Sequence, residues 1–106
     1  MAIVHVSTLT LRPGALQRWM EAMGPVFDAI ESSGARNMRT LVPVLGPECA
    51  NIVSIVWEAD DYDTWGSAIG KMYNAPAVIE GMVSHFGPDG TVLGMSNTTY
   101  SDVPRS

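Results

Sequence analysis

Apolar and polar residues alternate along the first twelve positions of the chain. One side of this stretch carries Ile3, His5, Ser7, Leu9 and Leu11, and the other carries Val4, Val6, Thr8 and Thr10. A period of two with many β-branched residues predicts a β-strand from Met1 to Arg12, ended by the Pro13-Gly14 turn. Because the first side mixes apolar residues with two polar ones, we expect it to be covered by helices but open at one point to a ligand.

The period lengthens to three and four residues after Ala15. Apolar side chains recur at Leu16, Trp19, Met20, Met23, Phe27 and Ile30. This spacing predicts an amphipathic helix of about five turns. Pro25 lacks the N–H that the preceding turn needs, so a kink or a break into two pieces is expected at Gly24-Pro25. Gly34 is placed for a left-handed cap.

Two further strands follow this helix. The first runs from Asn37 to Val44, and Pro43 puts its far end at an edge or a bulge. A turn over Leu45 to Ala50 leads to the next strand, Asn51 to Glu58. Its nearly continuous apolar run predicts a central position, buried on both faces.

The second helical region begins with two aspartates. Asp60 or Asp61 is expected to N-cap a helix that reaches Asn74. The helix then restarts at Asn74-Ala75-Pro76, with Asn74 as cap and Pro76 in the first turn, and ends at Gly87. Thr91 to Tyr100 reads as the last strand.

The order strand, helix, strand, strand, helix, strand predicts an α+β protein with the ferredoxin-like split βαβ fold, β-α-β-β-α-β. Residues 1–106 form a single domain with a four-stranded antiparallel sheet and helices on one face. The composition is 46% hydrophobic and 16% charged, more apolar than a small monomer easily hides. We therefore expect the bare sheet face to be buried against a second copy, in a homodimer.

Charge and cysteine content exclude several classes of partner. The net charge is −5 and the six basic residues are scattered, so nucleic acid and anionic membrane surfaces are not expected partners. The start does not resemble a signal peptide, and no apolar run is long enough to span a bilayer. The single Cys49 cannot form an intrachain disulfide, and with Glu48 beside it we expect an unreactive thiol in a reduced, cytoplasmic protein.

Two motifs resemble a known superfamily. Residues 57–65, WEADDYDTW, resemble the dimeric α+β barrel proteins, particularly the antibiotic-biosynthesis and haem-degrading monooxygenases. Residues 8–14, TLTLRPG, resemble the NIPSNAP-like members of the same superfamily. The resemblance implies a homodimer whose two sheets face each other as a barrel, with a small-molecule pocket in each subunit between sheet and helices.

The same resemblance assigns roles to two residues. Trp65 falls on the helix tryptophan that lines the pocket of the monooxygenases, and Ser7 falls near a first-strand position where haem degraders carry asparagine. The histidine that ligates haem in those enzymes has no counterpart here, since the matching region is Met72 to Pro76. No cofactor is therefore expected.

The candidate catalytic residues are His5, Ser7 and Tyr73. Imidazole has the pKa nearest neutrality, which makes His5 the best general base if its strand face lines the pocket; otherwise it is a hydrogen-bonded core residue. Ser7 or Tyr73 would donate hydrogen bonds to an oxyanion. His85 ends the last helix, where the helix dipole favours a protonated imidazole, and a structural role is expected for it.

Trp65, Trp19 and Met72 are the candidate wall residues of the pocket. Large rings and flexible methionines suit a flat, small apolar or aromatic ligand, although packing in the core explains them as well. A metal site is not expected, because the two histidines have no carboxylates at ligand spacing beside them.

Three functional hypotheses remain. The first is a cofactor-independent monooxygenase or cyclase that acts on an aromatic or polyketide-like ligand. The second is a non-catalytic, NIPSNAP-like ligand-binding or interaction protein. The third is a haem-binding protein.

Overall fold

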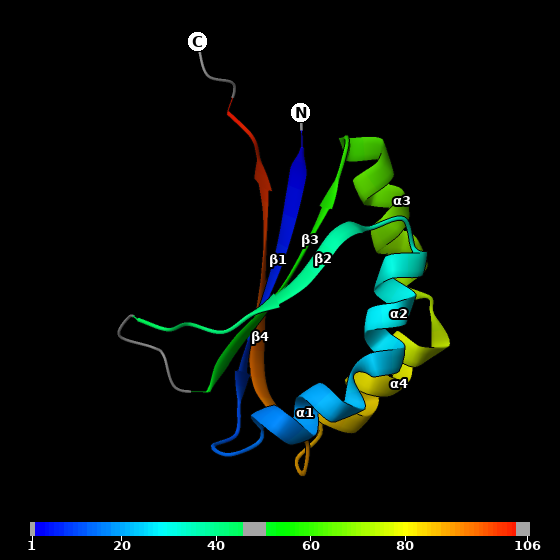
Figure 1. Ribbon diagram of the computed structural model, residues 1–106. Coiled ribbons are helices and arrows are strands. Elements are labelled where there is room, and N and C mark those ends of the chain that lie inside the picture. The colour runs from blue at the N-terminus through cyan, green and yellow to red at the C-terminus, as the bar shows by residue number, and fades with distance from the viewer. Residues whose placement is uncertain (1, 46–50, 104–106) are drawn as a thin grey trace.

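The computed structural model describes residues 2–45 and 51–103. Within these ranges, four antiparallel strands form one sheet, and the helices lie on one of its faces (Figure 1). The strands are β1 (Ile3–Leu11), β2 (Arg36–Leu41), β3 (Ile52–Ala59) and β4 (Val92–Ser101). The helices are α1 (Leu16–Ala22), α2 (Gly24–Ser32), α3 (Tyr62–Tyr73) and α4 (Pro76–His85). The strand order is β2-β3-β1-β4, which confirms the predicted ferredoxin-like α+β fold.

The central strand β1 pairs with β3 on one side and with β4 on the other. His5 lies opposite Trp57 of β3 and Thr99 of β4. Ser7 lies two residues further along β1, opposite Asn97 of β4. Because side chains alternate between the two faces of a sheet, these residues all lie on the face that the helices cover. The register thus gathers a row of polar side chains in an otherwise apolar layer.

The first helical region is broken where the sequence predicted a break. Helix α1 ends at Ala22 and α2 begins at Gly24, with Pro25 in the first turn of α2. The missing N–H of proline costs no hydrogen bond there, because the first turn of a helix has no internal acceptor for it. Gly34 follows α2 with a φ of +105°, which confirms its expected left-handed conformation.

The second helical region begins at the predicted aspartate but is divided differently. Asp61 is the N-cap of α3, and its Oδ1 accepts a hydrogen bond from the Thr64 N–H at 2.7 Å. The expectation that Asn74 caps α4 was wrong. Asn74 instead closes α3, where its Nδ2 donates to the Gly70 carbonyl at 2.7 Å, and Ala75 is the N-cap of α4. Ala75 is extended because it precedes Pro76, which disfavours helical geometry at that residue.

The strands occur where the sequence predicted them, but their first and last residues differ from the prediction. β3 lies between β2 and β1, as its apolar run indicated. β2 is an edge strand that ends at Leu41, so Pro43 lies beyond it rather than within it. Cys49 and most of the predicted turn over Leu45 to Ala50 lie outside the described residues.

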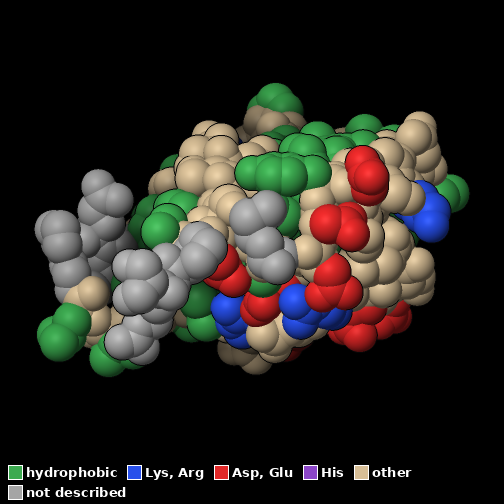
Figure 2. All heavy atoms as spheres, turned by 90° about the horizontal axis from the view of Figure 1, so that it is seen from above, with side chains coloured by type: hydrophobic (Ala, Val, Ile, Leu, Met, Phe, Trp, Pro, Cys, Tyr) green, Lys and Arg blue, Asp and Glu red, His purple; other side chains and the backbone are tan. Residues whose placement is uncertain are grey.

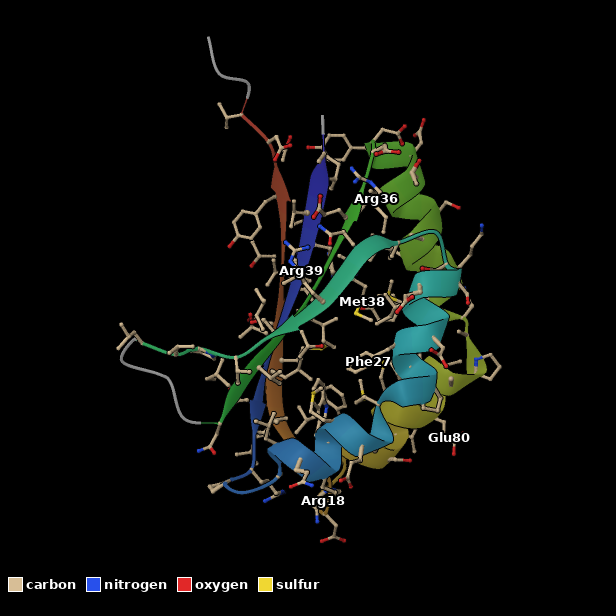
Figure 3. The ribbon with its side chains drawn as sticks, viewed as in Figure 1. Arg18, Phe27, Arg36, Met38, Arg39 and Glu80 are labelled. Carbon is tan, nitrogen blue, oxygen red and sulfur yellow. The ribbon has the colours of Figure 1, made fainter. Side chains whose placement is uncertain are left out.

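The core fills the layer between the sheet and the helices. Trp19 and Trp57 are the largest side chains buried in it. Phe27 from α2 and Met38 from β2 point into this layer and close it beside the edge strand (Figure 3). Arg39, the next residue of β2, lies on the opposite face of the sheet (Figure 3).

The face turned away from the helices is mixed rather than simply apolar. Val4 and Val6 lie half-buried on it, and Thr8 and Ser54 share a hydrogen bond of 3.2 Å. Polar pairs continue toward one end, where the Arg39 guanidinium meets the Glu58 carboxylate at 3.0 Å.

An end of the molecule carries a cluster of charges close to this face. Arg36 pairs with Asp60 at 2.9 Å, just before α3 begins. Figure 2 looks down on this end and shows acidic side chains beside basic ones. The Glu58 carboxylate accepts hydrogen bonds from Asn37 at 2.6 Å and from Arg39, and these bonds, the one from Asn37 above all, hold the pKa of Glu58 below its usual value. Among the described residues, no helix is long and apolar enough to cross a membrane.

Candidate functional site

A cavity of about 70 Å³ lies between the sheet and the helices. The strands contribute Ser7, Leu9, Ile55 and Met95 to its wall. Helices α1 and α2, with the residue between them, contribute Trp19, Met23, Val26 and Ile30. The rest of the wall comes from α3, α4 and the residue after α4, namely Met72, Tyr73, Val78, Gly81, Met82, His85 and Phe86. An apolar cavity of about 150 Å³ holds benzene in an engineered protein, so this smaller one has room for only part of such a ring.

The mouth of the cavity is formed by side chains that are only partly covered. Tyr73 and Met95 are 40% and 38% exposed, and Met82 and Phe86 are 38% and 39% exposed. By contrast, Trp19 and Leu9 are 0% and 2% exposed, so they lie at the closed end. A ligand can therefore enter past methionine side chains, which adapt readily to different shapes.

The polar side chains of the wall are few and none carries a fixed charge. Ser7, Tyr73 and His85 are the hydroxyl and imidazole groups in the wall, and it contains no Asp, Glu, Lys or Arg. The Ser7 hydroxyl donates to Oδ1 of Asn97 at 2.6 Å, which fixes its orientation. His85 is held in the same way, because its Nδ1 shares a hydrogen bond of 2.9 Å with the Thr91 hydroxyl.

Arg12 lies outside the cavity wall and forms hydrogen bonds with the loop that follows His85. Its Nε donates to the Gly90 carbonyl and its Nη2 to the Pro88 carbonyl, both at 2.6 Å. The backbone N–H of Arg12 also donates to the Thr91 carbonyl at 2.8 Å. The turn after β1 is thereby fastened to the loop that follows His85.

His5 lies beside the cavity rather than in its wall. It is 5% exposed and its ring packs between Trp57, at a centroid distance of 5.1 Å, and Trp65, at 6.2 Å. Its Nδ1 lies 3.0 Å from the Thr99 hydroxyl, and the Trp65 Nε1–H donates to the same nitrogen at 3.4 Å. Burial lowers the pKa of His5 below 6.5, and a hydrogen bond with the Asn97 side chain partly offsets this.

Four of the six residues singled out from the sequence line the cavity. Ser7, Tyr73, Trp19 and Met72 are in its wall, although they come from three different elements, β1, α1 and α3. His5 and Trp65 are not among the residues that line it. They contact each other beside the cavity, where His5 precedes Ser7 in β1 and Trp65 lies about two turns before Met72 in α3. The structure therefore brings the expected donors and wall residues together and sets the expected base behind them.

Two polar residues of the site, His85 and Asn97, were not predicted to belong to it. His85 was assigned a structural role at a helix end, yet Val78, Met82 and His85 recur at steps of four and three, which put them on one face of α4. Asn97 orients Ser7 from the neighbouring strand, and only the register of β1 against β4 reveals that contact. The spacing signal for His85 was present in the sequence, whereas the one for Asn97 was not.

No group of three or more His, Cys, Asp or Glu side chains that could hold a metal ion occurs in residues 2–45 and 51–103. The cavity wall has the imidazole of His85, the hydroxyl groups of Ser7 and Tyr73, and the indole ring of Trp19. These groups suit hydrogen bonding to an organic ligand.

Comparison with solved structures identifies similar folds. A NIPSNAP-like domain protein from Burkholderia xenovorans is 17% identical, with a TM-score of 0.71, over 99% of this chain and 88% of that one. A NIPSNAP family protein from Agrobacterium tumefaciens is 16% identical, with a TM-score of 0.73, over 97% of this chain and 94% of that one. A DABB family protein with a ferredoxin-like fold from Mesorhizobium loti is 15% identical, with a TM-score of 0.71, over 97% of this chain and 98% of that one.

These similarities show that the chain shares the ferredoxin-like fold of these NIPSNAP-like and DABB proteins. No family model matches the sequence, and no curated protein matches it either. A shared fold does not identify a reaction or a ligand, because these depend on the residues of the cavity.

Proposed function

We propose that this protein, with its NIPSNAP-like and DABB-like fold, binds a small, uncharged and largely apolar molecule in the cavity between sheet and helices. The observation that carries the proposal is the composition of the cavity wall. Apolar side chains surround Ser7, Tyr73 and His85, which is the usual make-up of a small-molecule site. A charged ligand is disfavoured, because its burial there would find no opposite charge.

The leading form of this proposal is catalytic: the bound ligand undergoes cofactor-independent oxygenation or cyclisation. Such a reaction needs a water-poor cavity, a base that generates a carbanion or enolate, and donors that hold the resulting oxyanion. The Tyr73 hydroxyl supplies one donor, and the Ser7 hydroxyl supplies a second when it turns from Oδ1 of Asn97 to the ligand. His5 is the base expected from the sequence, and His85 is the histidine whose side chain lines the cavity.

The second candidate is a non-catalytic, NIPSNAP-like binding protein. It is favoured by the position of His5, which is buried against Trp57 and engaged by Trp65 and Thr99 rather than exposed in the cavity wall. The cavity wall also contains no carboxylate that could act as an alternative base. The same pocket would then hold a ligand without changing it.

Ligand binding is tested by titrating the protein with one- to three-ring aromatic ketones and following the tryptophan fluorescence. We expect saturable binding that Met82→Asp weakens by at least tenfold, because Met82 lines the mouth of the cavity. The matched control is Val83→Asp, one residue along α4 at a side chain that is 75% exposed and outside the cavity wall. Equal effects of the two substitutions, or no binding at all, would contradict the proposal.

Catalysis is tested by measuring oxygen consumption and product formation with anthrone-like substrates. We expect turnover in the wild type and its loss in the variant that lacks the base, either His5→Gln or His85→Gln, with circular dichroism as the control for folding. Binding without turnover for every substrate in the panel would favour the non-catalytic candidate.

We infer further that the protein acts as a homodimer. The sheet face opposite the helices carries Val4, Val6 and the 55% exposed Tyr100, and within the described residues no helix covers it. A second copy packed on this face would bury that apolar surface and leave each cavity on the outside of the joint sheet layer.

A further inference from the structure

The indole nitrogen of Trp19 is buried without a hydrogen-bond partner among residues 2–45 and 51–103. Trp19 is 0% exposed and lines the closed end of the cavity. Buried tryptophan N–H groups usually find a partner, because an unmade hydrogen bond leaves the full cost of removing the donor from water. Trp65 follows that rule in the same layer, since its indole N–H donates to Nδ1 of His5.

The Trp19 ring is held in a fixed place by its neighbours. It meets the Phe27 ring edge to face, with a centroid distance of 5.9 Å and an interplanar angle of 73°. It is also part of the apolar core that includes Leu9 and Met23. The nitrogen itself is closed to a water-sized molecule, so an acceptor meets it once a flexible neighbour in the wall, such as Met23, changes rotamer.

The chemistry of the wall limits which acceptor can occupy this position. The indole nitrogen donates and cannot accept. A carboxylate or phosphate at the same depth would be buried without a cation, since no Lys or Arg lines the cavity. A neutral carbonyl oxygen accepts from an N–H without bringing either a charge or an unsatisfied donor of its own.

We propose that the Trp19 indole N–H is the anchor that recognises a carbonyl oxygen on the end of the ligand that enters the cavity first. This inference rests on the proposed binding function and specifies its ligand as an uncharged ketone, aldehyde or ester with an apolar body. The carbonyl group occupies the closed end of the cavity, and the remainder of the molecule lies toward Tyr73 and Phe86 at the mouth.

The test compares acetophenone with ethylbenzene, two molecules of nearly the same shape that differ by a carbonyl in place of a methylene group. In the wild type we expect acetophenone to bind about five- to tenfold more tightly, the gain typical of one added hydrogen bond. In Trp19→Phe the preference is expected to disappear, whatever the change in cavity size does to both affinities. Trp57→Phe is the matched control: Trp57 is also a buried tryptophan, 1% exposed, but lies outside the cavity wall, so the preference is expected to persist.

A second measurement needs no substitution. In ¹⁵N–¹H spectra of the wild-type protein, acetophenone is expected to shift the indole N–H signal of Trp19 downfield more than ethylbenzene does. Equal binding of the two molecules, or a preference that survives Trp19→Phe, overturns the anchor while leaving the binding function intact. Failure of both molecules to bind overturns the anchor and the proposed function together.

Discussion

The indole N–H of Trp65 donates to Nδ1 of His5 across 3.4 Å, so a residue of α3 sets the protonation of a residue of β1. A nitrogen that accepts a hydrogen bond carries no proton, and neutral His5 is therefore protonated on Nε2. A hydrogen bond from the Asn97 side chain acts in the other direction, because it raises the pKa of His5 and so favours the charged form of the ring. His5 is thus a neutral, oriented imidazole in the folded protein at neutral pH.

The first prediction concerns stability and pH. The pKa of His5 is below 6.5 in the folded state, because the buried ring is costly to charge, and it returns to about 6.5 on unfolding. As the pH falls below 6.5, the unfolded chain binds a proton that the folded protein does not, so the free energy of unfolding decreases until the pH reaches the folded-state pKa. Urea unfolding between pH 7.5 and 5 measures this slope.

The control for that experiment is His5→Gln, in which the titrating group is absent. We expect its stability to vary less over the same interval. The pKa of Glu58 and that of Asp61 are also lowered in the folded state. The stability that these carboxylates contribute is lost only at lower pH, where they begin to protonate near their unfolded pKa values. A slope between pH 7.5 and 5 that is unchanged in His5→Gln would exclude His5 as its source.

The second prediction concerns the contact between Trp65 and His5. Trp65→Phe removes the N–H that donates to Nδ1, and this bond stabilises the neutral imidazole. The smaller ring also admits water. Both effects raise the pKa of His5 toward its ordinary value, which NMR titration of the imidazole signals measures directly. A midpoint at or below the wild-type value would show that Trp65 does not hold His5 neutral.

The third prediction compares two glycines on different helices. A Cβ added at Gly81 of α4 would lie 2.9 Å from Cγ2 of Val26, whereas one added at Gly66 of α3 would meet nothing within 4 Å. Gly66→Ala is therefore expected to raise the free energy of unfolding by about 0.5–1 kcal/mol, from helix propensity alone. Gly81→Ala is expected to lower it by roughly 1 kcal/mol, because α2 and α4 must separate.

Urea unfolding of both variants checks this comparison. Stabilisation of similar size in the two variants would mean that the contact between α2 and α4 relaxes at no cost. Gly81 also lines the cavity, so the same variant is expected to weaken ligand binding.

The fourth prediction concerns the homodimer. Val6 lies on the sheet face that the helices leave uncovered, and a carboxylate there would be buried between two copies. We expect light scattering to give the mass of a dimer for the wild type and of a monomer for Val6→Glu. Ser67→Glu on the exposed side of α3 is the control and is expected to remain dimeric. A wild-type monomer at micromolar concentration would remove the dimer from the proposal.

The fold was predictable from the sequence because its signals are local. The alternation of Ile3 to Leu11 and the three- and four-residue steps after Ala15 are properties of single elements, and Pro25 and Gly34 mark their limits without reference to any partner. The ends of elements were less predictable where two signals competed. Asn74 is both a good N-cap and a good helix terminator, and the conformation of Ala75 before Pro76 decided between them.

The site was only partly predictable because it depends on contacts between distant residues. Ser7 and Tyr73 lie 66 positions apart and meet in one wall only through packing. His5 and Ser7 share a strand face, yet α3 covers the first with Trp65 and leaves the second open to the cavity. The alternation of residues in β1 does not reveal which part of its face a helix will cover.

The hydrogen bonds of Arg12 give the cavity two ends of unequal stiffness. They tie the turn that leads into α1, the helix of Trp19, to the loop that follows His85, so α1 cannot move away from this loop without breaking contacts to Gly90 and Pro88. The mouth has Met82 and Met95, whose unbranched side chains change rotamer at little cost. We expect selectivity to be strict for the part of a ligand that enters first and permissive for the part that stays outside, so that a series of molecules with one common head and different tails binds with similar strength.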